Sequence, residues 1–474
     1  MKLYNSLSKQ IEDIKPIKPG QLGIYSCGPT VYNHAHIGNL LSYIWADILR
    51  RTAKLDGTSI KHVMNITDVD DKTIRDSQDN FPDLKPMEAL IKFTDKYHKL
   101  FIDDLTKLNF DVSAMQIVSA RASIVQIQEI INSLITRNIA YLSDDGIYLS
   151  ISAFQKAGYK YGVLENIAIN KQQARIKNDE YDKDQAADFA IWKKQKDNEP
   201  AWKFTVKDND FTGRPGWHIE CSAMSTANLG QPFDIHTGGI DLKFPHHENE
   251  IAQSVATGNG NFCNCFMHSE HLLVDGGKMS KSKNNFYKLS DIVEKGIDPI
   301  AFRLLVLQGH YQHRLNFSFD SLFAAQTFLF SIYGLADRQF QPNGNSSILD
   351  VKAILTKSRE KITRYLENNL SMAQALSELS KIVDQFGEQP LDKNQTVELQ
   401  SYLSFIDSAF GLPLINRIDI SNSIKHKIAQ REQARNEKQF IQSDDIRKQL
   451  EENDDIKLLD KPFGVIWQRT TATS

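Results

Sequence analysis

The segment from residue 23 to residue 67 reads as one β-α-β unit, and this pattern restricts the fold more than any other feature of the chain. Residues 23–27 are short, apolar and β-prone, whereas residues 33–39 have the composition of a loop. Apolar side chains then recur at the spacing of an amphipathic helix, at Leu41, Ile44, Trp45 and Ile48. The helix is expected to end at residues 54–57, and residues 60–67 supply the next strand. Because open parallel sheets bind ligands in the loops that follow their strands, residues 33–39 are a candidate ligand site.

Two segments half a chain apart carry groups that suit the phosphates of a nucleotide. His36 stands at the expected start of the helix, where free backbone N–H groups attract phosphate. Lys278 and Lys281 follow a pair of glycines at 276–277 and place two ammonium groups on one loop. We therefore predict a single ATP site closed from two sides, with positive charge directed at the leaving pyrophosphate.

The composition is that of an ordinary globular chain. Its 474 residues are enough for roughly three or four domains, and 41% of them are hydrophobic and 24% charged. No segment approaches the ~20 apolar residues that span a bilayer, and the first residues lack the organisation of a signal peptide. We therefore expect a cytoplasmic location and no membrane partner. Four cysteines are too few for a disulfide scaffold and are better interpreted as ligands or as buried small hydrophobic residues.

The net charge of -3 does not indicate a nucleic-acid binder, because such domains usually carry a strong basic excess. Any RNA surface therefore has to be local, and the best candidate is the basic stretch at 425–448. Taken alone, this stretch is more simply a solvated helix face, as most runs of charge are.

Five ordered motifs resemble those of the cysteinyl-tRNA synthetases, a family of class I aminoacyl-tRNA synthetases. Two are general to class I: residues 36–39 read HIGN, similar to the HIGH signature, and residues 278–282 read KMSKS. Three are particular to the cysteine family: NITDVDDK at 65–72, GRPGWHIECSAM at 213–224 and FPHHENE at 244–250. The resemblance spans nearly the whole chain, to the pattern at 434–447, and it favours RNA binding by the basic stretch.

The resemblance implies an α/β fold, with a Rossmann-like class I catalytic domain, a connective insertion, and α-helical stem-contact and anticodon-binding domains. The insertion is shorter than the hundred or so residues that an editing domain needs for its own core, so no editing domain is expected. We expect the first catalytic half at 1–117, the insertion at 118–205, the second catalytic half at 206–300, stem-contact helices at 301–345, a helical anticodon-binding bundle at 346–420 and a tRNA-binding tail domain at 421–474.

The resemblance places the family's zinc ligands on Cys27, Cys221, His246 and Glu250. We expect the two cysteines on strand or loop segments, whereas His246 and Glu250 are spaced i, i+4 and share one helix face. Such N, S and O ligands suit tetrahedral zinc. From the spacing alone, buried cysteines and an exposed helix pair would be the simpler interpretation, because finger-like spacing is lacking.

A second cluster, formed by Cys263 and Cys265 with His268 nearby, is more compact in the sequence. On a strand, the two cysteines point to the same face, and we expect them to pack rather than to bind metal. No motif of the family covers this cluster.

The resemblance also assigns the substrate pocket. Trp217 is expected to form a wall that closes over the bound amino acid, with plain core packing as the alternative. His236 is placed at the active site, with a satisfied loop histidine as the alternative. The groups expected to hold the amino and carboxylate groups of the amino acid are Gly28, Thr30, Thr67 and Asp241. The ATP contacts are expected from His36, Gly38, Asn39, Lys278 and Lys281.

Zinc would separate cysteine from serine in this pocket. Shape complementarity discriminates such near-isosteres by only ~10². A thiolate binds zinc directly, whereas a hydroxyl group competes poorly for it. Because the metal has to accept a further ligand, Glu250 is expected to be the adjustable one.

The chain departs from the family pattern at two places. Asn39 replaces the last histidine of the HIGH signature, which keeps a hydrogen-bonding side chain but removes an imidazole. Residues 203–211 are polar and acidic where relatives carry a segment rich in Pro, Ser and Trp, and we expect a loop difference there.

The implied reaction has two steps. Cysteine attacks the α-phosphate of ATP to give cysteinyl-adenylate, and the terminal adenosine of the cysteine tRNA then attacks the activated carbonyl. The expected partners are L-cysteine, ATP with Mg²⁺ and cysteine tRNA, and the chain is expected to be a monomer. His36 and Lys281 would supply most of the charge stabilisation, with Lys278 assisting.

Three alternatives remain open. A cysteine ligase of the same fold would use a small amino-sugar acceptor, but residues 346–474 argue against it. A non-catalytic zinc protein that senses tRNA or nucleotide is disfavoured by the intact KMSKS motif. A class I synthetase for another amino acid, such as methionine, is disfavoured by the two thiolates from distant motifs.

Overall fold

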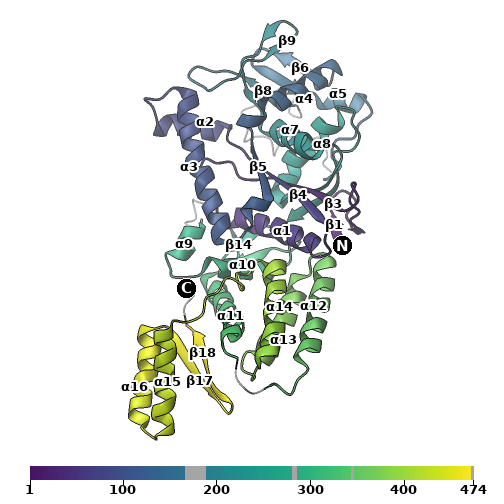
Figure 1. Cartoon of the computed structure of the whole chain (residues 1–474). Helices are drawn as coiled ribbons and strands as arrows, with labels where there is room; N and C mark the ends of the chain where they lie inside the picture. The colour runs from purple at the N-terminus through teal and green to yellow at the C-terminus, as the bar shows by residue number, and fades with distance from the viewer. Residues whose placement is uncertain (166–187, 280–284, 343–345, 471–474) are drawn as a thin grey trace. The chain divides into compact units, whose positions relative to one another are not determined.

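The computed structural model describes residues 1–165, 188–279, 285–342 and 346–470, so Lys281 lies outside the described residues. The chain forms two compact units (Figure 1). The first contains residues 1–273, 277–289 and 311–315, and the second contains residues 274–276, 290–310 and 316–474.

A five-stranded parallel sheet organises the first unit, in the order β13-β12-β3-β4-β5. Its strands are β3 (Gln21–Ser26), β4 (Ser59–Ile66), β5 (Met115–Ser119), β12 (Phe233–Gly239) and β13 (Cys263–Ser269). From β3 the chain adds β4 and β5 on one side, whereas β12 and β13 extend the other side. The order reverses between β3 and β12, and such a reversal opens a ligand crevice at the carboxyl ends of the strands.

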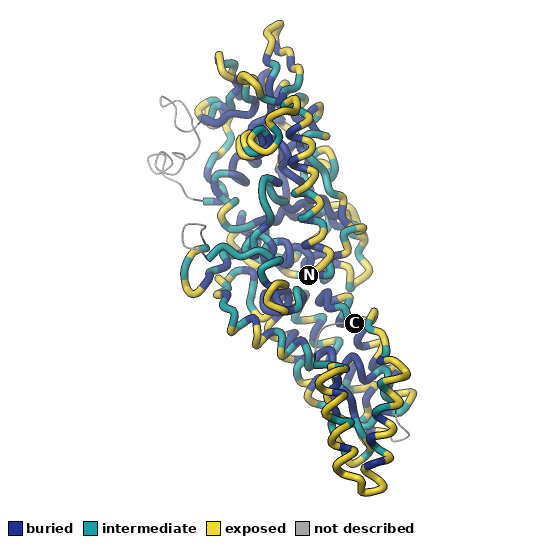
Figure 2. The backbone as a smooth tube through the Cα atoms, turned by 90° about the vertical axis from the view of Figure 1, so that its left-hand side faces the viewer, coloured by how far each residue is buried: buried dark blue, intermediate teal, exposed yellow. Residues whose placement is uncertain are grey.

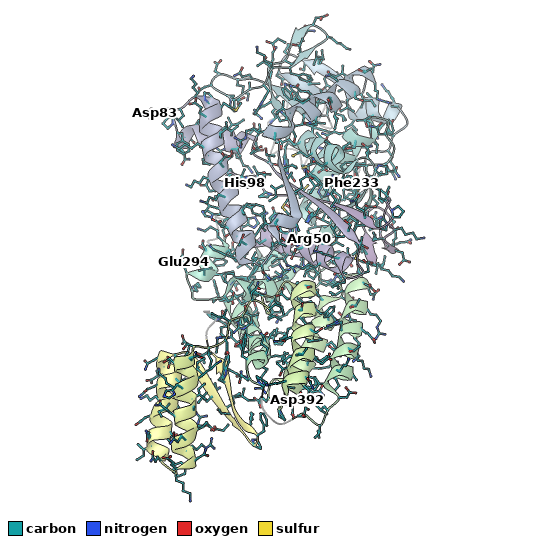
Figure 3. The ribbon with its side chains drawn as sticks, in the orientation of Figure 1. Arg50, Asp83, His98, Phe233, Glu294 and Asp392 are labelled. Atoms are coloured by element: carbon teal, nitrogen blue, oxygen red, sulfur yellow. The ribbon has the colours of Figure 1, made fainter. Side chains whose placement is uncertain are left out.

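Helix α1 (Ile37–Lys54) connects β3 to β4, as the sequence predicts, and its apolar residues are buried against the sheet. The helix begins at Ile37, inside the segment predicted as a loop, because His36 caps its first turn. At its other end Arg50, labelled in Figure 3, pairs with buried Asp47. The β-α-β prediction is therefore confirmed, and the loop that precedes α1 is shorter than expected.

A second, antiparallel sheet lies within the first unit, in the order β11-β8-β7-β6. Its strands are β6 (Ala140–Ser143), β7 (Gly146–Leu149), β8 (Phe189–Lys194) and β11 (Gly213–Pro215). Helix α4 (Ile124–Thr136) packs its buried residues into the same core. Residues 203–211, where a loop difference was predicted, include the small hairpin of β9 (Thr205–Val206) and β10 (Asn209–Asp210).

The remaining elements of this unit frame the site. Strand β11 leads into α7 (Trp217–Leu229), and the end of β12 leads through a short π-helical turn (Lys243–His247) into α8 (Glu248–Val255). Strand β4 leads into α2 (Asp71–Asn80), which is followed by α3 (Pro86–Lys107) and α5 (Ile151–Lys156). The smaller strands of this unit are β1 (Lys2–Asn5), β2 (Gln10–Asp13) and β15 (Gly277–Lys278), whereas β14 (Leu272–Val274) and β16 (Leu315–Phe317) each contain residues of both units.

The second unit is mainly helical, as the resemblance implies for residues 301–420. Its helices are α10 (Pro299–Leu307), α11 (Phe319–Asp337), α12 (Val351–Glu367), α13 (Met372–Phe386), α14 (Lys393–Phe410), α15 (Asn422–Asn436) and α16 (Phe440–Asn453), and the short α9 (Leu289–Val293) precedes them. Asp392, labelled in Figure 3, caps α14. Exposed residues alternate with buried ones along α12, α13 and α14, as amphipathic packing requires, whereas α10 is buried along almost its whole length (Figure 2).

The chain ends in a hairpin of β17 (Ile456–Lys461) and β18 (Gly464–Arg469), which the sequence analysis did not predict. A buried carboxylate ties this hairpin to α11: Asp337 at the end of α11 accepts hydrogen bonds from Arg417 and from Arg469 of β18. In the part of the chain that the structure describes, the helices are too short or too polar to cross a membrane.

Candidate active site

Four side chains from distant segments meet in the interior of the first unit: Cys27, Cys221, His246 and Glu250. Their donor atoms all lie within 4.8 Å of one another, and all four residues are buried. Cys27 Sγ lies 3.8 Å from Cys221 Sγ and 3.7 Å from Glu250 Oε1. His246 Nε2 lies 2.9 Å from Glu250 Oε1, so the i, i+4 pair faces one point.

The backbone explains how these residues meet. Cys27 directly follows β3, and the turn after β12 carries His246 and Glu250 to the same end of the sheet. Cys221 was expected on a strand or loop, but that prediction is wrong, because Cys221 lies on α7. The helix places it one turn after Trp217.

The protonation of the cluster departs from ordinary values in ways that suit a bound cation. Although burial opposes ionisation, the charges of His236 and His246 hold the pKa of Glu250 at about 2. Burial also opposes ionisation of Cys221, yet the hydrogen bond with Cys27 and the charge of His246 lower its pKa to about 6. Burial raises the pKa of Cys27 instead. A buried carboxylate and a buried thiolate thus share one point, which fits a metal ion by the chemistry of the donor set.

A second set of donors overlaps the first and contains Cys27, His236, His247 and Glu250. His236 Nε2 lies 2.7 Å from Glu250 Oε2, and His247 Nε2 lies 3.4 Å from Cys27 Sγ. His236 was assigned to the amino-acid pocket by sequence. The structure places it behind Glu250, fully buried, where it orients the carboxylate.

The sequence analysis did not single out His247, which the structure places in the second donor set. Its Nδ1 pairs with His268 Nε2 at 2.8 Å, and His268 Nδ1 pairs with Ser6 Oγ at 2.7 Å. The adjacent histidines at 246–247 could have indicated that His247 is also a candidate ligand. Spacing alone, however, cannot show which of the two histidines faces the cysteines. Neither donor set contains Cys263 or Cys265, which are buried in β13.

A cavity of 430 Å³ opens beside the cluster, at the carboxyl ends of β3 and β12. It brings most of the predicted site residues together, and its wall contains Cys27, Gly28, Thr30, His36, Gly38, Asn39, Trp217, Asp241 and Lys278. Thr67 lies next to this wall, because its N–H donates to Pro29 O at 3.1 Å. The sequence analysis did not single out Lys72 and Tyr43, which also line the cavity.

Gly28 allows the backbone after β3 to approach the next strand. A Cβ atom at this position would lie only 1.8 Å from Asn65 O, so no other residue fits without moving the backbone. The Gly28 N–H donates to Asn65 Oδ1 at 2.8 Å. These contacts with Asn65 therefore fix the position of the Gly28 backbone in the cavity wall.

Trp217 forms part of the cavity wall at the start of α7. Its ring stacks on His246, with 4.4 Å between the ring centroids and 28° between the planes, and 36% of the residue is exposed. One face of the indole therefore covers a residue of the donor cluster, while part of the ring remains accessible.

The departure at Asn39 has a structural explanation. His36 Nδ1 accepts the Asn39 backbone N–H at 3.2 Å, and Asn39 Oδ1 accepts the His36 backbone N–H at 3.3 Å. These reciprocal bonds form a capping box at the first turn of α1. The His36 ring also packs edge-on against Phe286 at 5.1 Å. Asn39 thus fixes the start of the helix that lines the cavity.

The basic stretch at 425–448 is largely paired within its own domain. Its ion pairs are Lys425–Asp419, Lys427–Asp454, Arg431–Asp460, Arg435–Asp460 and Lys448–Glu452. Acidic neighbours therefore offset much of the positive charge that the sequence analysis assigned to RNA contacts.

Comparisons with known proteins agree with this fold. Methionyl-tRNA synthetase of Mycobacterium tuberculosis in complex with methionyl-adenylate superimposes with a TM-score of 0.58 at 13% identity, and the match covers 82% of this chain and 92% of that one. A LeuRS of Agrobacterium radiobacter, in a ternary complex with tRNA and LeuAMS, gives a TM-score of 0.60 at 12% identity and covers 85% of each chain. At these identities the likeness concerns the fold, which is that of a class I tRNA synthetase.

The sequence comparisons are more specific. Residues 13–327 match the family profile of the class I (C) tRNA synthetase catalytic domain. A cysteine–tRNA ligase of Brachyspira hyodysenteriae is 38% identical over 484 residues, which cover 98% of each chain. Another, of Finegoldia magna, is 37% identical and covers 99% of this chain and all of its own. The chain belongs to the cysteine–tRNA ligase family.

Loss of the Asn39 side chain should weaken the start of α1. Asn39→Ala removes the acceptor for the His36 N–H, and we expect the free energy of unfolding to fall by about 1 kcal/mol in urea titrations. Asn39→Asp keeps the acceptor and serves as the matched control, and Asn39→His should be tolerated because a ring nitrogen can also accept. Equal stability of the alanine and aspartate variants would show that the capping box contributes nothing.

Proposed function

We propose that this chain is a cysteine–tRNA ligase, which activates L-cysteine with ATP and transfers it to the 3′ adenosine of cysteine tRNA. One observation carries the proposal: Cys27 belongs both to the buried donor cluster and to the wall of the cavity that His36 and Lys278 line. A site that recognises a thiol therefore adjoins a site with the groups that a nucleotide phosphate needs. The full-length similarity to cysteine–tRNA ligases supports the same proposal.

We further propose that Cys27, Cys221, His246 and Glu250 hold one zinc ion. The set has the two sulfur atoms, one imidazole nitrogen and one carboxylate that suit tetrahedral zinc, and Cys221 is already poised as a thiolate. When bound, zinc would bind and deprotonate the thiol of cysteine in preference to the hydroxyl of serine. His236 would hold Glu250 from the side opposite His246, because each histidine contacts a different carboxylate oxygen.

The amino acid would lie in the cavity between Trp217 and the loop after β3. Asp241 offers a carboxylate for the α-ammonium group, and Gly28, Thr30 and Thr67 lie where they could position the carboxylate. Trp217 would exclude water from the reacting groups, because its ring covers His246 on one side of the cavity.

The activation step requires positioning and charge stabilisation rather than a protein nucleophile. A carboxylate oxygen of cysteine attacks the α-phosphorus of ATP, and the bond to the bridging oxygen breaks to release pyrophosphate with its magnesium. His36 stands at the first turn of α1, where backbone N–H groups face anions. Lys278 enters the cavity wall from β15, and Lys281 would add a second ammonium group from the same motif.

The second unit would bind the tRNA. The comparisons do not support the alternative of an amino-sugar acceptor, because the cysteine–tRNA ligases match over the helical region as well. The basic residues at 425–448 are largely paired with acidic residues. RNA contacts there would therefore depend on individual basic residues that can give up an acidic partner for a phosphate.

The monomeric state, the cytoplasmic location and the domain boundaries stay predictions.

Removal of one sulfur donor should abolish metal binding. Cys27→Ser is expected to lose about one zinc per chain and most cysteine-dependent pyrophosphate exchange, because a tetrahedral site that lacks one ligand opens. Metal analysis and exchange assays measure both effects. Cys265→Ser changes a buried cysteine outside the donor sets and should keep its zinc. Full zinc content in Cys27→Ser would refute the ligand set.

Lys278→Ala, which removes the ammonium group, should slow adenylate formation more than it weakens cysteine binding. The charge acts where negative charge develops on the departing pyrophosphate, so a loss of ~10² in the single-turnover rate is expected. Lys99→Ala on α3 removes an exposed lysine away from the cavity and is the control. A rate unchanged from the wild type would exclude Lys278 from the activation step.

A further inference from the structure

Arg214 carries a buried guanidinium outside the donor cluster and the cavity. Its side chain is only 4% exposed, and it lies on β11, three residues before Trp217. Its terminal nitrogen pairs with Asp71 Oδ1, and its Nε lies 3.4 Å from Glu199 Oε2. A buried arginine without a partner would be strongly destabilising, and Asp71 and Glu199 together supply its counter-charge, so Glu199 still faces the guanidinium when Asp71 is neutralised.

Asp71 begins α2 and is the most exposed member of the pair, with 57% of its side chain accessible. Its second oxygen accepts from Lys193 of β8 at 2.8 Å. Although burial opposes ionisation, the charges of Arg214 and Lys193 hold the pKa of Asp71 at about 2. Asp71 therefore remains a carboxylate under all conditions in which the protein would work.

The ion pair connects the two segments that carry Trp217 and Lys72, both of which line the cavity. On one side, β11 passes through Gly216 directly into Trp217, and a Cβ atom at Gly216 would lie 2.1 Å from Ala190 O of β8. The Trp217 turn is thus packed rigidly on β8. On the other side, Asp71 ends the loop that begins at Thr67 and precedes Lys72 of the cavity wall.

We propose that Arg214 is a positioning residue, whose ion pair with Asp71 fixes the distance between the Trp217 wall and the Thr67–Lys72 loop and so sets the fit of the amino acid. The inference rests on the proposed function, since it concerns the cysteine pocket of that activity. Neither residue belongs to the donor sets or to the lining of the cavity in the described structure. Loosening the pair should therefore weaken cysteine binding and leave metal and ATP binding unchanged.

The test uses the full-length, zinc-loaded protein and begins with Asp71→Asn, which keeps the shape and removes the charge. We expect the KM for cysteine in pyrophosphate exchange to rise about tenfold, while the KM for ATP, the zinc content and the thermal midpoint stay near the wild-type values. Asp76→Asn is the matched control, because it removes an exposed ion pair with Arg75 on the same helix. It should change none of these quantities.

A double-mutant cycle separates positioning from general destabilisation. Arg214→Gln should raise the cysteine KM in the same direction, and Asp71→Asn combined with Arg214→Gln should be no worse than Arg214→Gln alone. Arg214→Lys keeps the charge but lacks the planar fork, so partial rescue is expected. If Arg214→Gln does not fold, Asp71→Asn and Arg214→Lys still decide the question.

An unchanged cysteine KM in Asp71→Asn would overturn the inference, as would an equal rise for cysteine and ATP accompanied by a lower thermal midpoint. A wild-type protein without cysteine-dependent exchange would refute the proposed function as well. A wild-type protein with full exchange and insensitive variants would refute the positioning role alone.

Discussion

The site depends on a buried carboxylate that is held ionised between two histidines. Glu250 is fully enclosed, and without His236 and His246 on its two oxygens the cost of burying its charge would drive it to the neutral form. Although burial opposes it, the same charge raises the pKa of His246 to about 10, and His246 in turn lowers the pKa of Cys221. A cation bound between the four donor atoms would take the place of the protons on these groups and balance the buried negative charges of Glu250 and Cys221. The donor set therefore fits a metal ion.

The strand order of the parallel sheet places the donor cluster beside the cavity. Cys27 follows β3 and the segment with His246 follows β12, and these neighbouring strands are the ones between which the order reverses. Helix α1 starts from the same edge, so His36 reaches the cavity from its first turn. The proposed thiol and phosphate sites are thus adjacent, because the residues assigned to both lie at the carboxyl ends of neighbouring strands.

Much of this arrangement could be predicted from the sequence, because the predictable parts lie in short motifs or regular periods. The helix that follows His36, the helical character of residues 301–420 and much of the cavity wall were accessible in this way, whereas Lys72 and Tyr43 of that wall were not. Other features depend on contacts between distant segments. Spacing could not show that Cys221 lies on a helix, that His236 supports Glu250, or that Arg214 pairs with Asp71 across 143 positions of the sequence. The hairpin at 456–469 was missed because it follows two polar helices and has only short β-prone runs.

The central claim is that the four-residue donor set binds zinc and recognises the thiol of the substrate directly. X-ray absorption at the zinc edge, on the metal-loaded protein with and without L-cysteine, tests it most directly. The free protein should show about two sulfur ligands at ~2.3 Å together with nitrogen and oxygen ligands, and addition of L-cysteine should raise the sulfur count to about three. L-serine should leave the spectrum unchanged. A spectrum that lacks sulfur ligands, or one that does not change when cysteine binds, would contradict the account.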